Sequence, residues 1–180
     1  MAEDRGVKLV APAPEFLEAY RDFCRATWGH AHNDYILHDP EKFGAWRKTI
    51  FAEYRDAAAG VGLPPGIVPS VTFWMMLEKR CIGVANIRPR LNGVLEVYGG
   101  HLGLCLRPEE RGKGYGTAVF PALFREAKRL GIGELVVTCA EDNLGCRKLN
   151  EKIPGYRLEF DEFTFGGVTR RICRYRHVLK

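Results

Sequence analysis

Arg107-Pro-Glu-Glu-Arg111-Gly-Lys-Gly-Tyr-Gly116 is the stretch that decides how the rest of this chain folds. Before it, Leu102, Leu104 and Leu106 alternate with other residues, which is the period-two pattern of a strand. After it, apolar residues recur at helical spacing over residues 115–130, with basic residues between them. The glycines of the stretch therefore fall at a turn between a strand and a helix.

The composition of this turn suits a phosphate group. Gly112 and Gly114 allow positive φ and the close approach of a ligand, and the first amides of a helix have no partner within it. Together with the helix dipole and the side chains of Arg111 and Lys113, these amides predict a polyphosphate site. A Rossmann dinucleotide site is excluded, because the turn lies past the middle of the chain and no acidic residue ends the next strand.

The motif Arg111-x-x-Gly114-x-Gly116 resembles the pyrophosphate-binding motif of the GNAT superfamily of N-acetyltransferases. The resemblance spans about residues 80–160, where the flanking segments are similar to the family's fourth strand, fifth strand and following helix. It implies an α/β (α+β) fold with a mixed, mostly antiparallel central sheet of about seven strands, flanked by about four helices. The implied order is β-α-α-β-β-β-α-β-α-β-β. We expect a single domain over residues 1–180, with its cofactor-binding half at about 80–160.

Local patterns place the elements along the chain. Strands are expected at residues 7–11, 71–77, 81–87, 97–106, 134–139, 156–163 and 168–178, and helices at 15–28, 39–60, 115–130 and 143–152. Asp39-Pro40 predicts a capped helix start, and Pro121 predicts a kink or a late start of its helix. Turns are expected near residues 78–79 and 91–93, and a surface loop at 60–70.

Composition limits the compartment and the partners. The six cysteines form no Cys-x-x-Cys pair, so reduced core thiols of a cytoplasmic protein are favoured. No apolar run has membrane-spanning length, and the first residues lack the apolar core of a signal peptide. The net charge of +5 suits an anionic cofactor, and nucleic acid is the lesser interpretation because the basic residues are dispersed. The exception is a cluster at Arg170, Arg171, Arg174 and Arg176, which we interpret as a solvated sheet edge.

The resemblance implies acetyl-CoA as cosubstrate and gives no reason to expect a metal. Backbone of the fourth strand is expected along the pantetheine arm, the turn on the pyrophosphate, and the Leu106 N–H near the tetrahedral oxyanion. The cofactor-binding residues implied are Leu104, Cys105, Leu106, Arg111, Gly112, Lys113, Gly114, Tyr115, Gly116, Thr117 and Asn143. In this family the last strands often pair between subunits, which leaves a homodimer open.

Asn150 is a departure from the family pattern. Many members carry a tyrosine four residues past the position of Cys146, and it protonates the departing thiolate. A carboxamide donates hydrogen bonds but has no acidic proton, so Asn150 is not a general acid. Two accounts fit: water or another residue protonates the thiolate, or the protein binds acyl-CoA without turnover. The first is favoured.

His101 and Glu96 are the candidate catalytic bases, because both lie in the fourth strand or in the segment that leads into it. A histidine satisfied by its sheet neighbours and a solvated glutamate are the structural alternatives. The candidate acceptor-binding residues are Asn33, Asp34, Tyr35, Arg88 and Arg90, with Arg88 and Arg90 on one strand face. A metal cluster of His30, His32 and His38 is disfavoured.

These features predict an N-acetyltransferase in which a primary amine of a small molecule attacks the thioester directly. The alternatives are an acyl-CoA-binding regulatory or interaction protein without turnover, and an acetyltransferase that acts on a protein or nucleic-acid partner. The identity of the acceptor is not readable, because acceptor pockets are built from loops.

Overall fold

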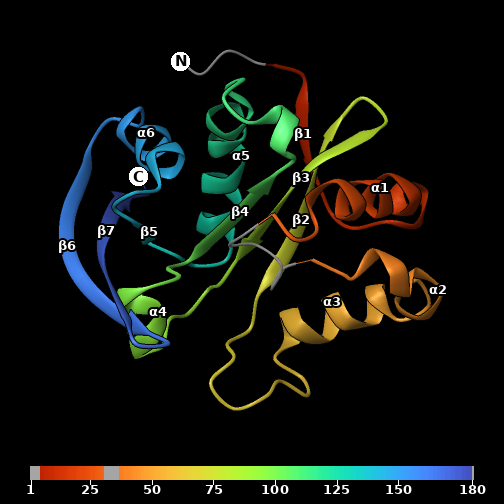
Figure 1. The fold of residues 1–180 in the computed structure, drawn as a ribbon, viewed down its shortest axis with the longest axis horizontal. Helices are drawn as coiled ribbons and strands as arrows, with labels where there is room; N and C mark the ends of the chain where they lie inside the picture. Colours follow the sequence, from red (N-terminus) through yellow and green to blue (C-terminus); the bar gives the residue numbers. More distant parts are fainter. Residues whose placement is uncertain (1–4, 31–36, 180) are drawn as a thin grey trace. The chain divides into compact units, whose positions relative to one another are not determined.

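The computed structural model describes residues 5–30 and 37–179 (Figure 1). Its contacts divide the chain into two compact units, Met1–Asn86 with Leu104–Phe120, and Ile87–Gly103 with Pro121–Lys180. The seven strands form a four-stranded sheet in the order β1-β2-β3-β4 and a three-stranded sheet in the order β5-β7-β6. The predicted fold class is confirmed, although the described residues form six α-helices instead of about four.

The element bounds follow the chain. The first half holds β1 (Val7–Val10), η1 (Pro14–Phe16), α1 (Leu17–Thr27), η3 (Pro40–Lys42), α2 (Phe43–Trp46), α3 (Ile50–Ala59), β2 (Val71–Leu77) and β3 (Arg80–Ile87). The second half holds α4 (Gly93–Val97), β4 (Leu102–Leu106), η4 (Pro108–Glu110), α5 (Tyr115–Arg129), β5 (Glu134–Ala140), α6 (Leu144–Glu151), β6 (Tyr156–Phe165) and β7 (Val168–Val178).

The predicted helix at 39–60 begins as expected but is interrupted. The Asp39 side chain accepts a hydrogen bond from the Glu41 N–H at 3.0 Å, which confirms the cap before Pro40. The chain then turns between α2 and α3, where the Thr49 N–H donates to the Trp46 carbonyl at 3.0 Å. A β-branched residue whose hydroxyl also reaches that carbonyl competes with the helical bonding pattern, which explains the break.

The predicted strand at 97–106 is wrong in its first half. Asn92 caps a short helix, α4, because its side chain accepts a hydrogen bond from the Leu95 N–H at 3.0 Å. The turn predicted at 91–93 is therefore a helix start. Gly99 and Gly100 follow with φ of 118° and 60°, and β4 begins only at Leu102. A good N-cap outweighs the strand preference of the apolar residues after it.

Helix α5 begins at Tyr115 and continues through Pro121 to Arg129, so the predicted late start is wrong. The ring of Pro121 removes one backbone N–H from the helix ladder. The two units meet in sequence at this residue, since the first ends at Phe120 and the second resumes at Pro121. The predicted kink stays a prediction.

An aromatic cluster forms the core of the first unit. Tyr20 and Trp74 are fully buried, and their rings stack with centroids 4.4 Å apart and an interplanar angle of 10°. Trp46 meets the Tyr20 ring edge-on at 5.9 Å. The hydroxyls within the cluster are paired, since the Tyr54 hydroxyl donates to the Tyr20 oxygen at 3.1 Å and the Tyr20 oxygen lies 2.9 Å from His38 Nδ1. Among the described residues, the buried Trp74 Nε1 has no hydrogen-bond partner. Aromatic packing and satisfied hydroxyls together stabilise this layer between the helices and β2.

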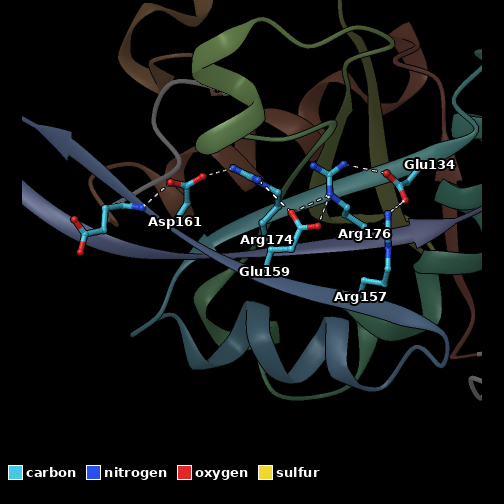
Figure 2. A network of polar contacts seen from close by, with 7 residues as sticks. Glu134, Arg157, Glu159, Asp161, Arg174 and Arg176 are labelled. Carbon is cyan, nitrogen blue, oxygen red and sulfur yellow. Dashed lines mark hydrogen bonds and ion pairs between the residues drawn. The ribbon is translucent and has the colours of Figure 1, made fainter.

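The three-stranded sheet of the second unit carries alternating charges on one face (Figure 2). Arg176 contacts Glu134 at 2.9 Å and Glu159 at 3.1 Å, and Arg174 contacts Glu159 at 3.2 Å. The network also includes an Arg174–Asp161 pair and an Arg157–Glu134 pair at 2.5 Å. β7 lies between β5 and β6 from Ile172 to Val178, so the predicted sheet edge is wrong for Arg174 and Arg176, whereas Arg170 and Arg171 precede the residues that pair with β5. The charges of Arg174 and Arg176 are balanced by carboxylates on neighbouring strands.

Candidate active site

The turn predicted to bind phosphate, residues 111–116, lies at the junction of η4 and α5 in the first unit. Gly112 and Gly114 adopt φ of 75° and 86°, which other residues rarely adopt. The Ala118 N–H donates to the Gly114 carbonyl at 3.0 Å. The amides of residues 115–117 therefore precede the first rung of α5 and have no carbonyl of their own helix to reach. Gly116 lies inside the first helical turn.

Two cationic side chains of this turn are held by local acceptors. Arg111 Nε donates to the Leu106 carbonyl at 3.2 Å, which ties the turn to the end of β4. Lys113 Nζ lies 3.0 Å from Glu110 Oε2, and the Glu110 carboxylate also pairs with Arg80. The Lys113 hydrogen bond, with help from Arg80, holds the pKa of the buried Glu110 carboxyl below its usual value. Glu110 thus fixes Lys113 beside the two positive-φ glycines.

Arg5 is a cation of this turn that the sequence pattern does not indicate. A Cβ atom placed on Gly114 would lie 2.9 Å from Arg5 Nε and 3.3 Å from its guanidinium carbon. The Arg5 side chain therefore lies directly over Gly114. Nothing in the local pattern around residue 5 marks it, because the contact joins residues more than a hundred positions apart.

Other predicted cofactor residues divide by side-chain exposure. Cys105 is buried in the aromatic cluster, so only its backbone faces a ligand, whereas Leu104 and Leu106 are half-buried. Asn143 caps α6, since its side-chain oxygen accepts from the Cys146 N–H at 3.1 Å. Its amide nitrogen remains the group that can reach a cofactor. The binding roles of all these residues stay predictions.

Asn150 is fully buried within the second unit, and both ends of its carboxamide are engaged. Its nitrogen donates to the Cys146 carbonyl at 2.9 Å, and its oxygen lies 2.9 Å from His177 Nε2. By its place in the sequence, Asn150 stands where many family members carry a proton donor. Its observed contacts are those of a residue that joins α6 to β7.

A cavity of about 360 Å³ in the second unit contains several of the predicted acceptor and catalytic residues. Its lining residues are Pro89, Arg90, Leu91, Glu96, His101, Glu134, Val136 and Arg176. Among the residues that the structure describes, no hydrogen bond or ion pair engages the side chains of Glu96 and Arg90. Glu134 is different, because Arg157 and Arg176 bind it. Burial alone would raise the pKa of Glu134, but these two hydrogen bonds outweigh it and keep the pKa below its usual value.

His101 enters this cavity with one ring nitrogen already occupied. The backbone N–H of Val136 donates to His101 Nδ1 at 2.9 Å, while the backbone N–H of His101 donates to the Val136 carbonyl at 2.8 Å. Burial, followed by the charges of Arg176 and Arg88, lowers the pKa of His101. The ring is therefore neutral at pH 7, with its proton on Nε2, and acts as a hydrogen-bond donor toward the cavity.

The two arginines predicted to share an acceptor site lie beyond the end of β3 and have different roles. Arg88 Nη1 donates to the carbonyls of Gly99 and Gly100, at 3.3 and 3.1 Å, and so braces the segment before β4. Arg90 is exposed and lines the cavity. Asn33, Asp34 and Tyr35 lie outside the described residues.

No group of three His, Cys, Asp or Glu side chains within residues 5–30 and 37–179 is arranged to hold a metal ion. Among the same residues, no helix is long and apolar enough to span a membrane.

Comparison with known proteins identifies a family. Residues 13–154 match the family model described as acetyltransferase (GNAT) domain, which covers parts of both units. No curated protein matches the chain in sequence.

Solved structures share the fold at low sequence identity. RimL, a ribosomal L7/L12 alpha-N-protein acetyltransferase in complex with coenzyme A, is similar with a TM-score of 0.67 and 14% identity, over 99% of this chain and 97% of that chain. The microcin C7 self-immunity acetyltransferase MccE, in complex with acetyl-CoA and AMP, has a TM-score of 0.64 and 15% identity, over 97% and 93%. An acetyltransferase from Salmonella typhimurium that modifies the N-terminal serine of L7/L12 has a TM-score of 0.63 and 14% identity, over 98% and 96%.

Proposed function

The chain belongs to the GNAT family of acetyltransferases, and on that premise we propose that it transfers the acetyl group of acetyl-CoA to a primary amine of a small molecule. The amine nitrogen attacks the thioester carbon directly. The carbon–sulfur bond breaks, the nitrogen loses a proton, and coenzyme A leaves as a thiol. The observation that carries the choice of acceptor is the Glu96 carboxylate in the 360 Å³ cavity of the second unit, which no other described residue engages in a hydrogen bond or ion pair.

The turn around Gly114 supports acetyl-CoA as cosubstrate. Its free helix amides and its cations, Arg111 and Lys113, are the groups that bind a pyrophosphate. Arg5 adds a further positive charge over Gly114. RimL and MccE, which share the fold, bind coenzyme A and acetyl-CoA respectively.

The cavity supports an amine that also carries an acidic group. Glu96 offers an unpaired carboxylate to an ammonium ion, and Arg90 offers an unpaired guanidinium to a carboxylate or phosphate. Glu134 and Arg176 form an ion pair in the cavity wall, so their charges neutralise one another. A zwitterionic acceptor would match both unpaired charges, whereas a hydrocarbon amine would leave Arg90 without a partner.

Glu96 is the better candidate for the catalytic base. His101 accepts a hydrogen bond at Nδ1 and carries its proton on Nε2, so it has no free lone pair to receive another proton. Glu96 is exposed and has both carboxylate oxygens available, directly or through a water molecule. His101 then orients the acceptor molecule by donating a hydrogen bond to it from Nε2. Water protonates the thiolate, since Asn150 is buried and fully engaged.

Isotope-labelled acetyl-CoA and a mixed pool of amines, amino acids and polyamines test the proposal. Mass spectrometry should find labelled amides, with amino acids or other zwitterions enriched over polyamines. Transfer to polyamines alone would contradict the assignment of the cavity. Binding of acetyl-CoA without any product, from this pool and then from a metabolite extract, would support a binding protein without turnover instead. Gly114→Asp serves as the control that should lose the labelled products.

Acetylation of nucleic acid is disfavoured by the pairing of the C-terminal arginines. Arg174 and Arg176 contact Glu134, Glu159 or Asp161 (Figure 2). Arg171 contacts Glu141 at 3.2 Å. Three of the four arginines in the cluster at residues 170–176 are thus paired with carboxylates, which lowers the net positive charge that the cluster offers to the phosphates of a polymer.

A further inference from the structure

The first unit contains a cavity of about 670 Å³, lined by α1 and by the turn that joins β2 to β3. Its lining residues are Ala19, Asp22, Arg25, Ala26, Leu77, Glu78, Lys79, Arg80 and Arg107. Four of these side chains are cationic and two are acidic, so positive charge dominates the wall. A cavity of this volume has room for a small molecule, since ligand sites typically measure about 300–1,000 Å³.

Arg107 is the buried cation of this cavity. Its side chain is only 8% exposed, and its Nε donates to the Cys81 carbonyl at 2.8 Å, which fixes the guanidinium plane. Its ion-pair partner, Glu109, lies 3.6 Å from Nη1, beyond hydrogen-bond distance. Among the described residues, no group accepts a hydrogen bond from Nη1 or Nη2. A fixed guanidinium with such N–H groups available is suited to a carboxylate or a phosphate.

Arg25 and Lys79 add positive charge from α1 and from the turn after β2. Arg25 Nη1 lies 3.9 Å from Asp22 Oδ1, too far for a hydrogen bond, and half of its side chain is exposed. Lys79 is exposed, and within the described part of the chain it forms no hydrogen bond or ion pair. Glu78, just before it, has a φ of 53°, which residues other than glycine rarely adopt. Backbone strain of this kind is common at ligand sites.

A series of ion pairs connects the cavity to the turn around Gly114. Arg80, a lining residue, contacts Glu109 at 2.6 Å and also pairs with Glu110. The Glu110 side chain is buried, and its second oxygen lies 3.0 Å from Lys113 Nζ. Glu110 therefore divides its charge between a residue of the cavity and a residue of the turn.

We propose that this cavity binds an oxyanion, the phosphate or carboxylate group of a small molecule, and that the bound anion weakens the affinity of the turn for coenzyme A. Arg107, Arg25 and Lys79 contact the anion. Arg80 also turns toward it, so Glu110 loses one of its two cations and holds Lys113 more tightly. Less of the Lys113 charge then remains for a pyrophosphate. The coupling rests on the proposed function, whereas the oxyanion site needs only the cavity.

Nuclear magnetic resonance of the ¹⁵N-labelled protein tests the oxyanion site. Inorganic phosphate and succinate are titrated separately into the Gly114→Asp variant, whose added carboxylate keeps anions from the turn, and sodium chloride holds the ionic strength constant. We expect the backbone amides of residues 25–26 and 78–80 to shift saturably, with a Kd on the order of 1 mM for at least one probe. Saturation by phosphate alone would identify a phosphate ester as the ligand class, and saturation by succinate alone a carboxylate. No saturable shift of these amides with either probe would overturn the proposal.

Matched variants separate the cavity from the general effect of charge. Lys79→Ala and Arg107→Lys should each raise the Kd for the probe at least about fivefold, because one removes a cation and the other removes the planar fork. Lys48→Ala removes an exposed lysine of the first unit that does not line the cavity, so it should leave that Kd unchanged. Circular dichroism checks that each variant is folded. Equal effects of Lys79→Ala and Lys48→Ala would overturn the site.

Isothermal titration with coenzyme A tests the coupling. A saturating probe should raise the Kd of the parent chain for coenzyme A about fivefold and no further, and it should have no such effect in Lys79→Ala. An equal rise in both proteins would mean that the probe competes at the turn, which would overturn the coupling, as would an unchanged Kd in the parent chain. Failure of the parent chain to bind coenzyme A without any probe would contradict the proposed function and the coupling together. The resonance titration would still decide whether the cavity binds an oxyanion.

Discussion

Gly114 gives the sharpest test of the phosphate turn, because two isosteric substitutions there differ only in charge. Its φ of 86° strains any side chain, and a new Cβ would lie 2.9 Å from Arg5 Nε. The strain costs about 1–2 kcal/mol and is nearly the same for asparagine and aspartate. The flexible end of Arg5 has to move in both variants. Any difference in affinity for coenzyme A between Gly114→Asp and Gly114→Asn therefore reports the added charge.

The size of that difference follows from Coulomb's law. Two unit charges about 4 Å apart repel by roughly 1 kcal/mol in water and by roughly 4 kcal/mol near a protein surface. We expect an intermediate penalty of about 2 kcal/mol, which is roughly thirtyfold in Kd. Because the site is at the surface, the ratio should shrink as salt rises from about 20 mM to about 300 mM.

Isothermal titration of both variants with coenzyme A measures the two dissociation constants. Thermal unfolding of each variant provides the control, since both must be folded to the same extent at the assay temperature. The same pair in an Arg5→Ala background shows whether the new carboxylate recruits Arg5, in which case the ratio grows when Arg5 is absent. Equal dissociation constants for the aspartate and asparagine variants at low salt would refute a phosphate site at Gly114.

Three further predictions concern the second unit. Asn150→Tyr should lower the Tm by about 4–8 °C without raising turnover, because overpacking a buried site and losing two hydrogen bonds cost about 2 kcal/mol. An unchanged Tm with faster turnover would contradict this prediction. Arg88→Ala should reduce the free energy of unfolding in urea by about 1–2 kcal/mol, because two hydrogen bonds are lost. Arg90→Ala should leave that free energy unchanged and raise the KM for a zwitterionic acceptor about tenfold. A loss of stability in the Arg90 variant and a raised KM in the Arg88 variant would exchange their roles. Burial lowers the pKa of His101 in the folded state, so the unfolded chain binds a proton at His101 more readily, and the free energy of unfolding should fall as pH drops below about 6.5. His101→Gln should make the free energy of unfolding depend less on pH. The same pH dependence for variant and parent in urea titrations would show that His101 does not contribute.

Elements that show a regular apolar pattern over many residues, or that begin at a strong cap, were predictable from sequence. The strands on either side of the Glu78 turn and the two strands of the β6–β7 hairpin appear where alternation placed them. Helix α4 was not, because five residues are too few to show a helical period, and the cap by Asn92 was interpreted as a hairpin turn. The order of the strands within a sheet decides which strand lies at its edge, and the sequence does not show that order. The position of β7 between β5 and β6 was therefore not predictable.

The site was predictable where its residues are adjacent in sequence. The turn from Arg111 to Thr117 is contiguous, so its glycine spacing and charges carry the chemistry. The cavity around Glu96 is assembled from five separate segments, and no local pattern links Glu96 to Glu134 or Arg176. The occupied Nδ1 of His101 depends on a backbone amide 35 positions away. Contacts of this kind change the role of a residue without changing the sequence around it.

The aromatic cluster has a spectroscopic consequence. All three tryptophans, Trp28, Trp46 and Trp74, belong to the first unit, and the second unit has none. Tryptophan emission during denaturation therefore follows the first unit alone, while far-ultraviolet circular dichroism follows the helices and strands of both. Coincident curves would mean that one cooperative transition melts the whole chain, as a single domain requires. Separate curves would give the transition of the first unit from tryptophan emission, and that of the second unit from the part of the dichroism change that the emission does not follow.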